Sequence, residues 1–293
     1  MKGNLSSKGS CILRLQGVLA DLNTAEKRVA DYVLQNAEEV ANYTVEDLAD
    51  KAKSSYATIT RLCKRLGYVG FKEFKSNLIN DAFWSRGMDN LVYEMSITKG
   101  ATTETISEKV YTLAMNMLED SYKIMDASII ESAVDKMLAA GSICFIGAGY
   151  SGISARYGYS KFFRIGLPCY SELDSTLYRM KISIMQETDV LFAISSSGRT
   201  NNIIEAVRLA KKNNVTVISL SDFAITPLTK LSDYNLYTTP RNANLFMEID
   251  MPLLIGQIAI IDVLYSCCCV RLAEKAVENY DKTKASTDAE KMK

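Results

Sequence analysis

The chain has 293 residues, of which 48% are hydrophobic and 23% are charged. This length and composition indicate a soluble globular protein, and two domains suit the length better than one. Basic and acidic residues number 34 each, so the net charge favours no class of partner. The chain contains no histidine, which excludes histidine general-base chemistry and histidine-ligated metal.

The cysteines and the most apolar stretch favour a cytoplasmic protein. There are seven cysteines, and residues 267–269 are three in a row, which suits neither disulfide pairing nor a CxxC metal site. The first residues lack the apolar core of a signal peptide. Residues 251–270 are long enough to cross a membrane, but Pro252, Gln257 and Asp262 interrupt them, which favours a buried or interface helix. We expect no membrane association, no cofactor and no metal.

Residues 11–84 have the periodicity of helices. The segment TAEKRVADYVLQN places Val29, Tyr32 and Val33 on one face, and Thr24 is its expected N-cap. Two closely spaced helices follow, TVEDLADKA and SYATITRLCKRLG, and FKEFKSNLINDAF gives another. The close pair has the layout of a helix-turn-helix, and residues 1–84 are therefore predicted to be one DNA-binding domain.

The second helix of this pair has a basic outer face. Ile59, Leu62 and Leu66 recur on its inner side, while residues 51–75 contain seven basic residues and one acid. Such a face is that of an ordinary solvated helix or of a major-groove reader, in which Lys and Arg neutralise phosphates and Ser, Thr and Arg reach base edges. On the second interpretation, double-stranded DNA contacts Ser55, Tyr56, Thr58, Thr60, Arg61, Lys64 and Arg65.

The pattern changes after a connection at residues 85–103. Two helices are predicted at 104–124 and 127–140, and then helices alternate with short runs that are apolar on both faces. This alternation predicts a doubly wound α/β domain, residues 104–280, with a five-stranded parallel sheet. Its last helix covers about 244–278, and the polar tail 281–293 is predicted to be disordered. The predicted strands are 142–147, 168–171, 189–194, 215–220 and 234–238.

Two loops at predicted carboxyl ends of strands carry small and hydroxyl residues. After 189–194 comes SSSGRT, in which hydroxyls can donate to a phosphate, Gly198 permits a tight turn and the next helix aims its N–H groups at an anion. Arg199 either clamps that anion or faces solvent. After 142–147 comes GAGYSG, whose glycine spacing matches a dinucleotide fingerprint. No acidic residue is well placed to hold a ribose, Glu172 included, so NAD is the weaker interpretation.

Both halves resemble one known family. Residues from Leu22 to Leu78, above all RLCKRLGYVGFKEFK, resemble the N-terminal domain of RpiR-type transcriptional regulators. Where that family has Gly and an apolar residue in the turn, this chain has Lys53 and Ser54, so Lys53 is expected to adopt a positive φ at a cost of about 1 kcal/mol.

The pieces IGAGYSG, KFFRIGLPC and DVLFAISSSGRTNNIIEAVRLAKKNN resemble the sugar isomerase (SIS) domain over residues 125–255. In that family an S-x-S-G-x-T loop holds the phosphate of a phosphosugar. The resemblance implies a flavodoxin-like strand order for the sheet. It also implies that a sugar phosphate binds at Gly147, Ser151, Ser195, Ser196, Ser197, Gly198 and Thr200.

These features favour a transcriptional regulator of sugar metabolism that is not an enzyme. We expect a homodimer, or else a homotetramer, with residues 104–140 and 251–270 at the interface. One alternative is a phosphosugar isomerase, whose base would be Glu248, although a helix-start or interface carboxylate is the simpler role for that residue. The other is an SIS adaptor that binds a protein rather than DNA.

Overall fold

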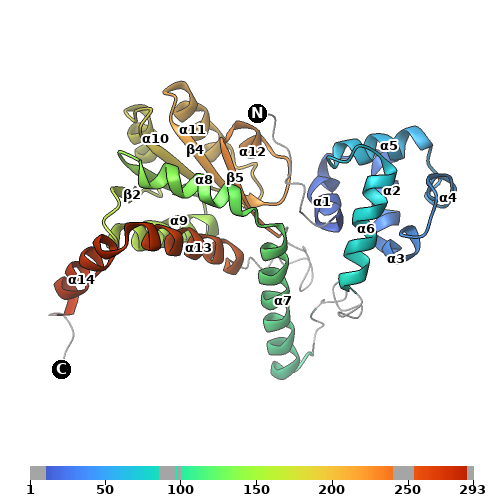
Figure 1. The fold of residues 1–293 in the computed structure, drawn as a ribbon, viewed down its shortest axis with the longest axis horizontal. Coiled ribbons are helices and arrows are strands. Elements are labelled where there is room, and N and C mark those ends of the chain that lie inside the picture. Colours follow the sequence, from blue (N-terminus) through green and yellow to red (C-terminus); the bar gives the residue numbers. More distant parts are fainter. Residues whose placement is uncertain (1–10, 86–96, 98–99, 240–253, 289–293) are drawn as a thin grey trace. The chain divides into compact units, whose positions relative to one another are not determined.

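The computed structural model describes residues 11–85, 97, 100–239 and 254–288, which fall into two compact units. The helical unit contains the N-terminal helices, and the sheet unit contains the strands and the helices around them (Figure 1). The elements of the helical unit are α1 (Cys11–Val18), η1 (Leu19–Asp21), α2 (Thr24–Gln35), α3 (Ala37–Val40), α4 (Val45–Lys51), α5 (Tyr56–Arg65), α6 (Phe71–Ser85) and α7 (Thr103–Ile124).

Residues 11–85 bury one apolar core between helices α1 to α6. Leu15, Val33, Leu48, Leu66 and Leu78 are fully buried in it, each from a different segment of the bundle. The helical periodicity of the sequence therefore predicted the inner faces correctly, because each helix of this size must bury one apolar stripe.

Side-chain caps set the helix starts. Asn23, and not Thr24, caps α2: its side chain accepts the N–H groups of Ala25 and Glu26, each at 3.0 Å. Thr44 and Asp47 form a capping box at the start of α4, because Thr44 Oγ1 accepts the Asp47 N–H and the Asp47 carboxylate accepts the Thr44 N–H. The second of these bonds is the largest cause of the lowered pKa of Asp47.

The sheet unit has the predicted topology. Its five parallel strands lie in the order β2-β1-β3-β4-β5, which is the flavodoxin-like order. The strands are β1 (Ile143–Gly147), β2 (Cys169–Ser171), β3 (Val190–Ile194), β4 (Thr216–Asp222) and β5 (Tyr234–Thr238). The helices are α8 (Ala127–Leu138), α9 (Tyr150–Arg164), α10 (Ser175–Ser183), α11 (Asn201–Lys212), α12 (Pro227–Leu231), α13 (Ile255–Leu272) and α14 (Glu274–Asp288).

Both faces of the sheet are covered by helices, as its apolar strands require. On β1, Phe145 belongs to the core shared with α8, α9 and α13, whereas Cys144 and Ile146 belong to the core shared with α10 and α11. Figure 1 shows α10 and α11 on the opposite side of the sheet from α9 and α13. Alternate side chains of β1 and β3 thus enter different cores, which is the reason that these two runs, ICFIG and VLFAI, show no polar positions.

Helix α13 is long and apolar enough, by length and composition, to cross a membrane. Ile260, Ile261, Leu264 and Cys268 lie on the side of α13 that packs into the core of the sheet unit, and 33% of the helix is buried in this way. The chain then bends at Ala273, where φ is 49°, and continues as α14 to Asp288. Our prediction of a disordered tail was therefore wrong for residues 281–288, whose charged side chains suit an exposed helix as well as a coil.

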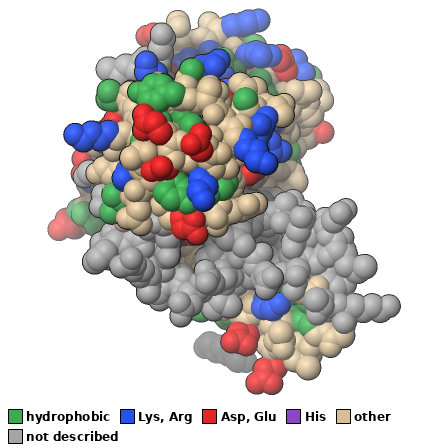
Figure 2. Space-filling view, turned by 90° about the vertical axis from the view of Figure 1, so that its right-hand side faces the viewer, with side chains coloured by type: hydrophobic (Ala, Val, Ile, Leu, Met, Phe, Trp, Pro, Cys, Tyr) green, Lys and Arg blue, Asp and Glu red, His purple; other side chains and the backbone are tan. Residues whose placement is uncertain are grey.

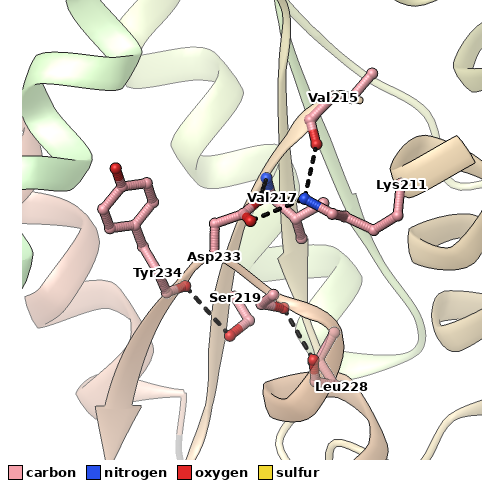
Figure 3. A network of polar contacts seen from close by, with 8 residues as sticks. Lys211, Val215, Val217, Ser219, Leu228, Asp233 and Tyr234 are labelled. Atoms are coloured by element: carbon pink, nitrogen blue, oxygen red, sulfur yellow. Dashed lines mark hydrogen bonds and ion pairs between the residues drawn. The ribbon is translucent and has the colours of Figure 1, made fainter. Parts of the chain in front are cut away.

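The amino end of β4 is held by a polar network (Figure 3). The Asp233 carboxylate accepts bonds from the Lys211 ammonium at 2.7 and 2.8 Å and from the Val217 N–H at 2.8 Å. The Asp233 N–H in turn donates to the Val217 carbonyl at 2.9 Å. Ser219 Oγ adds a bond to Asn235 Oδ1 at 2.6 Å. This network lies at the opposite end of the strands from the carboxyl ends, where ligands bind in such sheets. We infer that its role is structural and that it fixes the register of β5.

Candidate phosphate cradle and DNA-contact helix

The loop between β3 and α11 is a tight turn fastened to its surroundings. The Gly198 N–H donates to the Ser195 carbonyl at 2.9 Å, and the Ser195 and Thr200 hydroxyls lie 3.1 Å apart. The Gly198 carbonyl accepts the Leu228 N–H of α12 at 3.2 Å. Gly198 has a φ of +60°, which glycine adopts without cost. These bonds hold the loop against the start of α12.

The facing loop, between β1 and α9, requires its glycines. A Cβ on Gly147 would lie 2.4 Å from the carbonyl oxygen of Ser151, so the strand end and the first turn of the helix are in direct contact. Gly149 caps α9 with a φ of +56°. This close approach brings Ser151 to the carboxyl end of the sheet, next to the loop after β3.

A glutamine from α13 joins the two loops. Gln257 is buried, with 4% of its surface exposed, and its Nε2 lies 2.9 Å from Ser196 Oγ and 3.5 Å from Ser151 Oγ. Its Oε1 accepts the Ser154 hydroxyl at 2.7 Å. The Ser196 N–H also donates to Ser151 Oγ at 3.4 Å. The sequence had shown Gln257 only as a polar interruption of an apolar run, and that interruption was the available signal for a role in the site.

The structure thus brings together most of the cradle residues expected from the sequence. Ser151, Ser195 and Ser196 converge with Thr200 at the carboxyl ends of β1 and β3. Ser197 and Arg199 are exposed at the tip, where the Ser197 hydroxyl accepts only a weak bond, at 3.3 Å, from the Arg199 N–H. Hydroxyls, a tight glycine turn and the N-terminus of the 12-residue helix α11 give a cluster of hydrogen-bond donors suited to an oxyanion.

Helix α5 exposes some of the residues that we expected on its outer face. Tyr56 is 61% exposed, Ser55, Arg61 and Lys64 are exposed, and Thr60 is half-buried. Ser55 also caps the helix, accepting the Thr58 N–H at 3.3 Å. Figure 2 shows Lys and Arg side chains interspersed with Asp and Glu over one face of the molecule, so basic and acidic side chains are mixed on that face.

Two of the residues expected to contact DNA make contacts within the helical unit. Thr58 is 7% exposed and its hydroxyl lies 3.0 Å from that of Ser55, so it faces the start of its own helix. The Arg65 guanidinium bonds the Glu26 carboxylate at 3.2 Å and the Asp21 carbonyl at 2.6 Å. Periodicity placed Arg65 on the outside correctly, since its side chain is 39% exposed, but it could not show that α2 and η1 reach it.

Comparison with known proteins agrees with both units. Residues 10–83 match the helix-turn-helix domain of the rpiR family, and residues 136–261 match the SIS domain. An uncharacterized HTH-type transcriptional regulator of Bacillus subtilis, YbbH, is 32% identical over 95% of this chain and 97% of its own length. The chain belongs to the RpiR family of transcriptional regulators. The regulator HexR of Escherichia coli is 28% identical over 92% of this chain and 92% of its own.

Solved structures of this regulator family share the fold. NanR of Vibrio vulnificus, in complex with ManNAc-6P, superposes with a TM-score of 0.61 at 27% identity, covering 97% of this chain and 100% of NanR. The sugar isomerase domain of an RpiR transcription factor from Sphaerobacter thermophilus gives a TM-score of 0.57 at 18% identity over 61% of this chain and 98% of its own. These likenesses confirm the predicted architecture of helix-turn-helix and SIS domains.

Two expectations concern catalysis and metal. Glu248, the candidate isomerase base, lies outside the described residues. Within the described parts of the chain, no group of three or more Cys, Asp or Glu side chains is arranged to hold a metal ion. The named relatives in this family are transcriptional regulators, which favours a regulatory role for the SIS domain.

Proposed function

We propose that this RpiR-type regulator senses a sugar phosphate in its SIS domain and binds operator DNA through α5. The phosphate would lie in the cradle formed by Gly147, Ser151, Ser195, Ser196, Ser197, Gly198 and Thr200. The observation that carries this proposal is the convergence of the β1 and β3 loops, whose hydroxyls lie within 3.5 Å of one another around Gln257.

A relative supports the ligand class. NanR, which is similar to this chain over nearly its full length, was solved with a phosphosugar. A sugar phosphate offers a dianion for the hydroxyls and helix N-terminus, and neutral hydroxyls for the rest of the pocket. Arg199, exposed at the tip of the loop, is placed to meet solvent or a ligand that enters from there.

The DNA-contact surface that we propose is narrower than the sequence suggested. It contains Ser55, Tyr56, Thr60, Arg61 and Lys64, which reach the outside of α4–turn–α5, and it omits Thr58 and Arg65. Ligand binding would alter DNA affinity only if the sugar phosphate binds two states of the protein unequally.

We propose that the protein acts as a homodimer in the cytoplasm, where its DNA partner is. Helix α7 exposes Tyr111, Met115 and Tyr122, at 72%, 60% and 73% of their surfaces, and their spacing places them along one side of the helix. Such a stripe is suited to contact a second copy. Light scattering of the purified chain, with Tyr111→Ser and Met115→Ser together, tests this; an unchanged dimer mass would remove α7 from the interface.

Thermal-shift screening with a panel of sugar phosphates tests the sensor. A compound that binds the native state alone must raise the unfolding temperature, and its non-phosphorylated parent sugar should not. Turnover of any of these compounds by the purified protein would favour the isomerase instead, and a panel with no shift would count against phosphate sensing.

A further inference from the structure

Gln257 is the buried polar residue at the centre of the cradle, and its surroundings fix which way its amide points. The Ser154 side chain is fully buried, and its hydroxyl donates to Gln257 Oε1 at 2.7 Å. The amide NH₂ is therefore directed at the two loops, where its nitrogen lies 2.9 Å from Ser196 Oγ and 3.5 Å from Ser151 Oγ. An amide nitrogen can only donate, so both serine oxygens act as acceptors in these bonds.

In this arrangement, the Ser151 hydroxyl can still donate one hydrogen bond. A hydroxyl has two acceptor positions and one hydrogen to donate. The Ser151 oxygen accepts from the Gln257 amide and from the Ser196 N–H at 3.4 Å, which occupies both acceptor positions. The two serine hydroxyls lie 3.5 Å apart, which is long for a bond between hydroxyls, so a charged phosphate oxygen would accept the Ser151 hydrogen more strongly than Ser196 does.

We propose that Gln257 is a positioning residue. Its amide donates a hydrogen bond to the Ser151 oxygen, so that the Ser151 hydroxyl directs its own hydrogen toward a phosphate. This inference rests on the proposed sugar-phosphate site and adds a residue from α13, which neither loop motif contains. It also predicts that the identity of the amide matters more than its volume, because a carboxylate at the same place accepts hydrogens instead of supplying them.

Three variants separate positioning from packing. Gln257→Glu keeps the shape and reverses the donor, Gln257→Met keeps the length and removes both polar atoms, and Gln186→Glu adds the same charge at an exposed site of the same unit. Each is titrated with inorganic phosphate and with glucose 6-phosphate, while circular dichroism and the unfolding temperature without ligand report the fold. We expect Gln186→Glu to bind like the wild type, Gln257→Met to bind several-fold more weakly, and Gln257→Glu to bind more weakly than Gln257→Met by about 10-fold or more.

A double-mutant cycle tests whether Gln257 acts through Ser151. In a Ser151→Ala background there is no hydroxyl to orient, so the difference between Gln257→Glu and Gln257→Met should shrink to a few-fold. An undiminished difference would mean that the new carboxylate simply repels phosphate, and equal affinities for the two variants with Ser151 intact would also overturn the inference.

These results are distinguishable from failure of the proposed function. A wild-type protein that binds neither anion, or whose binding is unaffected by Ser197→Ala, would overturn both the sensor and the role of Gln257. Binding that depends on Ser197 but is the same in Gln257→Glu and Gln257→Met would overturn only the role of Gln257.

Discussion

Gly198 lies directly against Thr226: a Cβ built on Gly198 would stand 2.2 Å from Thr226 Oγ1. Thr226 Oγ1 is held in place, because it accepts the Thr229 N–H at 3.2 Å and caps α12. The Gly198 carbonyl accepts a further bond from Leu228 of the same helix. The cradle loop is therefore seated on the start of α12, and only glycine fits between them.

Gly198→Ala is predicted to destabilise the protein and abolish phosphate binding. Gly149→Ala is the matched control, because Gly149 also has a positive φ but no atom within 4 Å of the added Cβ. The control should lose about 1–3 kcal/mol from backbone strain alone. Gly198→Ala should lose a further 1–3 kcal/mol or so from overpacking, measured by chemical denaturation. Equal losses for the two variants would contradict the contact with Thr226.

Ser197→Ala and Ser195→Ala should separate binding from folding. The Ser197 hydroxyl is exposed and makes one weak bond, so its removal should leave stability unchanged while weakening sugar-phosphate binding about 10-fold. Ser195 is 3% exposed and its hydroxyl lies 3.1 Å from that of Thr200, so Ser195→Ala should also cost about 1 kcal/mol of stability. Calorimetric titration with denaturation curves measures both, and a Ser197→Ala variant that binds normally would contradict the proposed phosphate site.

Arg61→Ala and Lys64→Ala are predicted to weaken DNA binding in different ways. Arg61, in the middle of α5, is proposed to reach bases, and its loss should cost about 1–3 kcal/mol on a specific operator and little on random DNA. Lys64, near the end of α5, is placed to meet phosphates, and its loss should weaken both and reduce the salt slope by about 1. Fluorescence anisotropy over a range of salt concentrations distinguishes them. Wild-type behaviour of both variants would favour the protein-binding adaptor.

Arg65→Ala should lower stability first and DNA binding only as a consequence. The change removes the partner of Glu26, whose side chain is 6% exposed, together with a bond to the Asp21 carbonyl. Because the guanidinium is 39% exposed, the expected loss is only about 1 kcal/mol. Unfolding of the isolated variant by urea checks this, and a variant that is as stable as the wild type yet fails to bind operator would return Arg65 to the contact surface.

Lys53→Gly is predicted to stabilise the helix-turn-helix. Lys53 has a φ of 47°, a left-handed conformation that costs a side-chain-bearing residue about 1 kcal/mol and costs glycine little. Its carbonyl still accepts the Arg28 guanidinium at 2.9 Å in the variant, because that bond uses the backbone. Lys51→Gly removes the same charge inside helix α4 and should instead destabilise by up to about 1 kcal/mol. Thermal unfolding should therefore move in opposite directions for the two variants.

The sequence predicted most local structure correctly, and its errors have physical causes. Every predicted strand exists, with bounds within two residues, because a buried parallel strand must be apolar on both faces. The positive φ expected at Lys53 is present. The N-cap of α2 was misplaced by one residue, because Asn23 and Thr24 are both good caps and only the bonds to Ala25 and Glu26 distinguish them.

By itself, the sequence determined the two-domain organisation, the sheet order implied by its resemblance, and the hydroxyl-rich loop SSSGRT. These properties depend on local periodicity and on residues adjacent in the chain. Only the tertiary structure showed which outward side chains are bonded to other parts of the protein: Arg65 bonds Glu26, 39 positions away. It alone placed Gln257 between Ser196 and Ser151, which lie 61 and 106 positions earlier in the chain. The Arg65 contact depends on how helices pack together, and the Gln257 contacts arise where a parallel sheet brings distant segments to one edge; no spacing in the sequence records either.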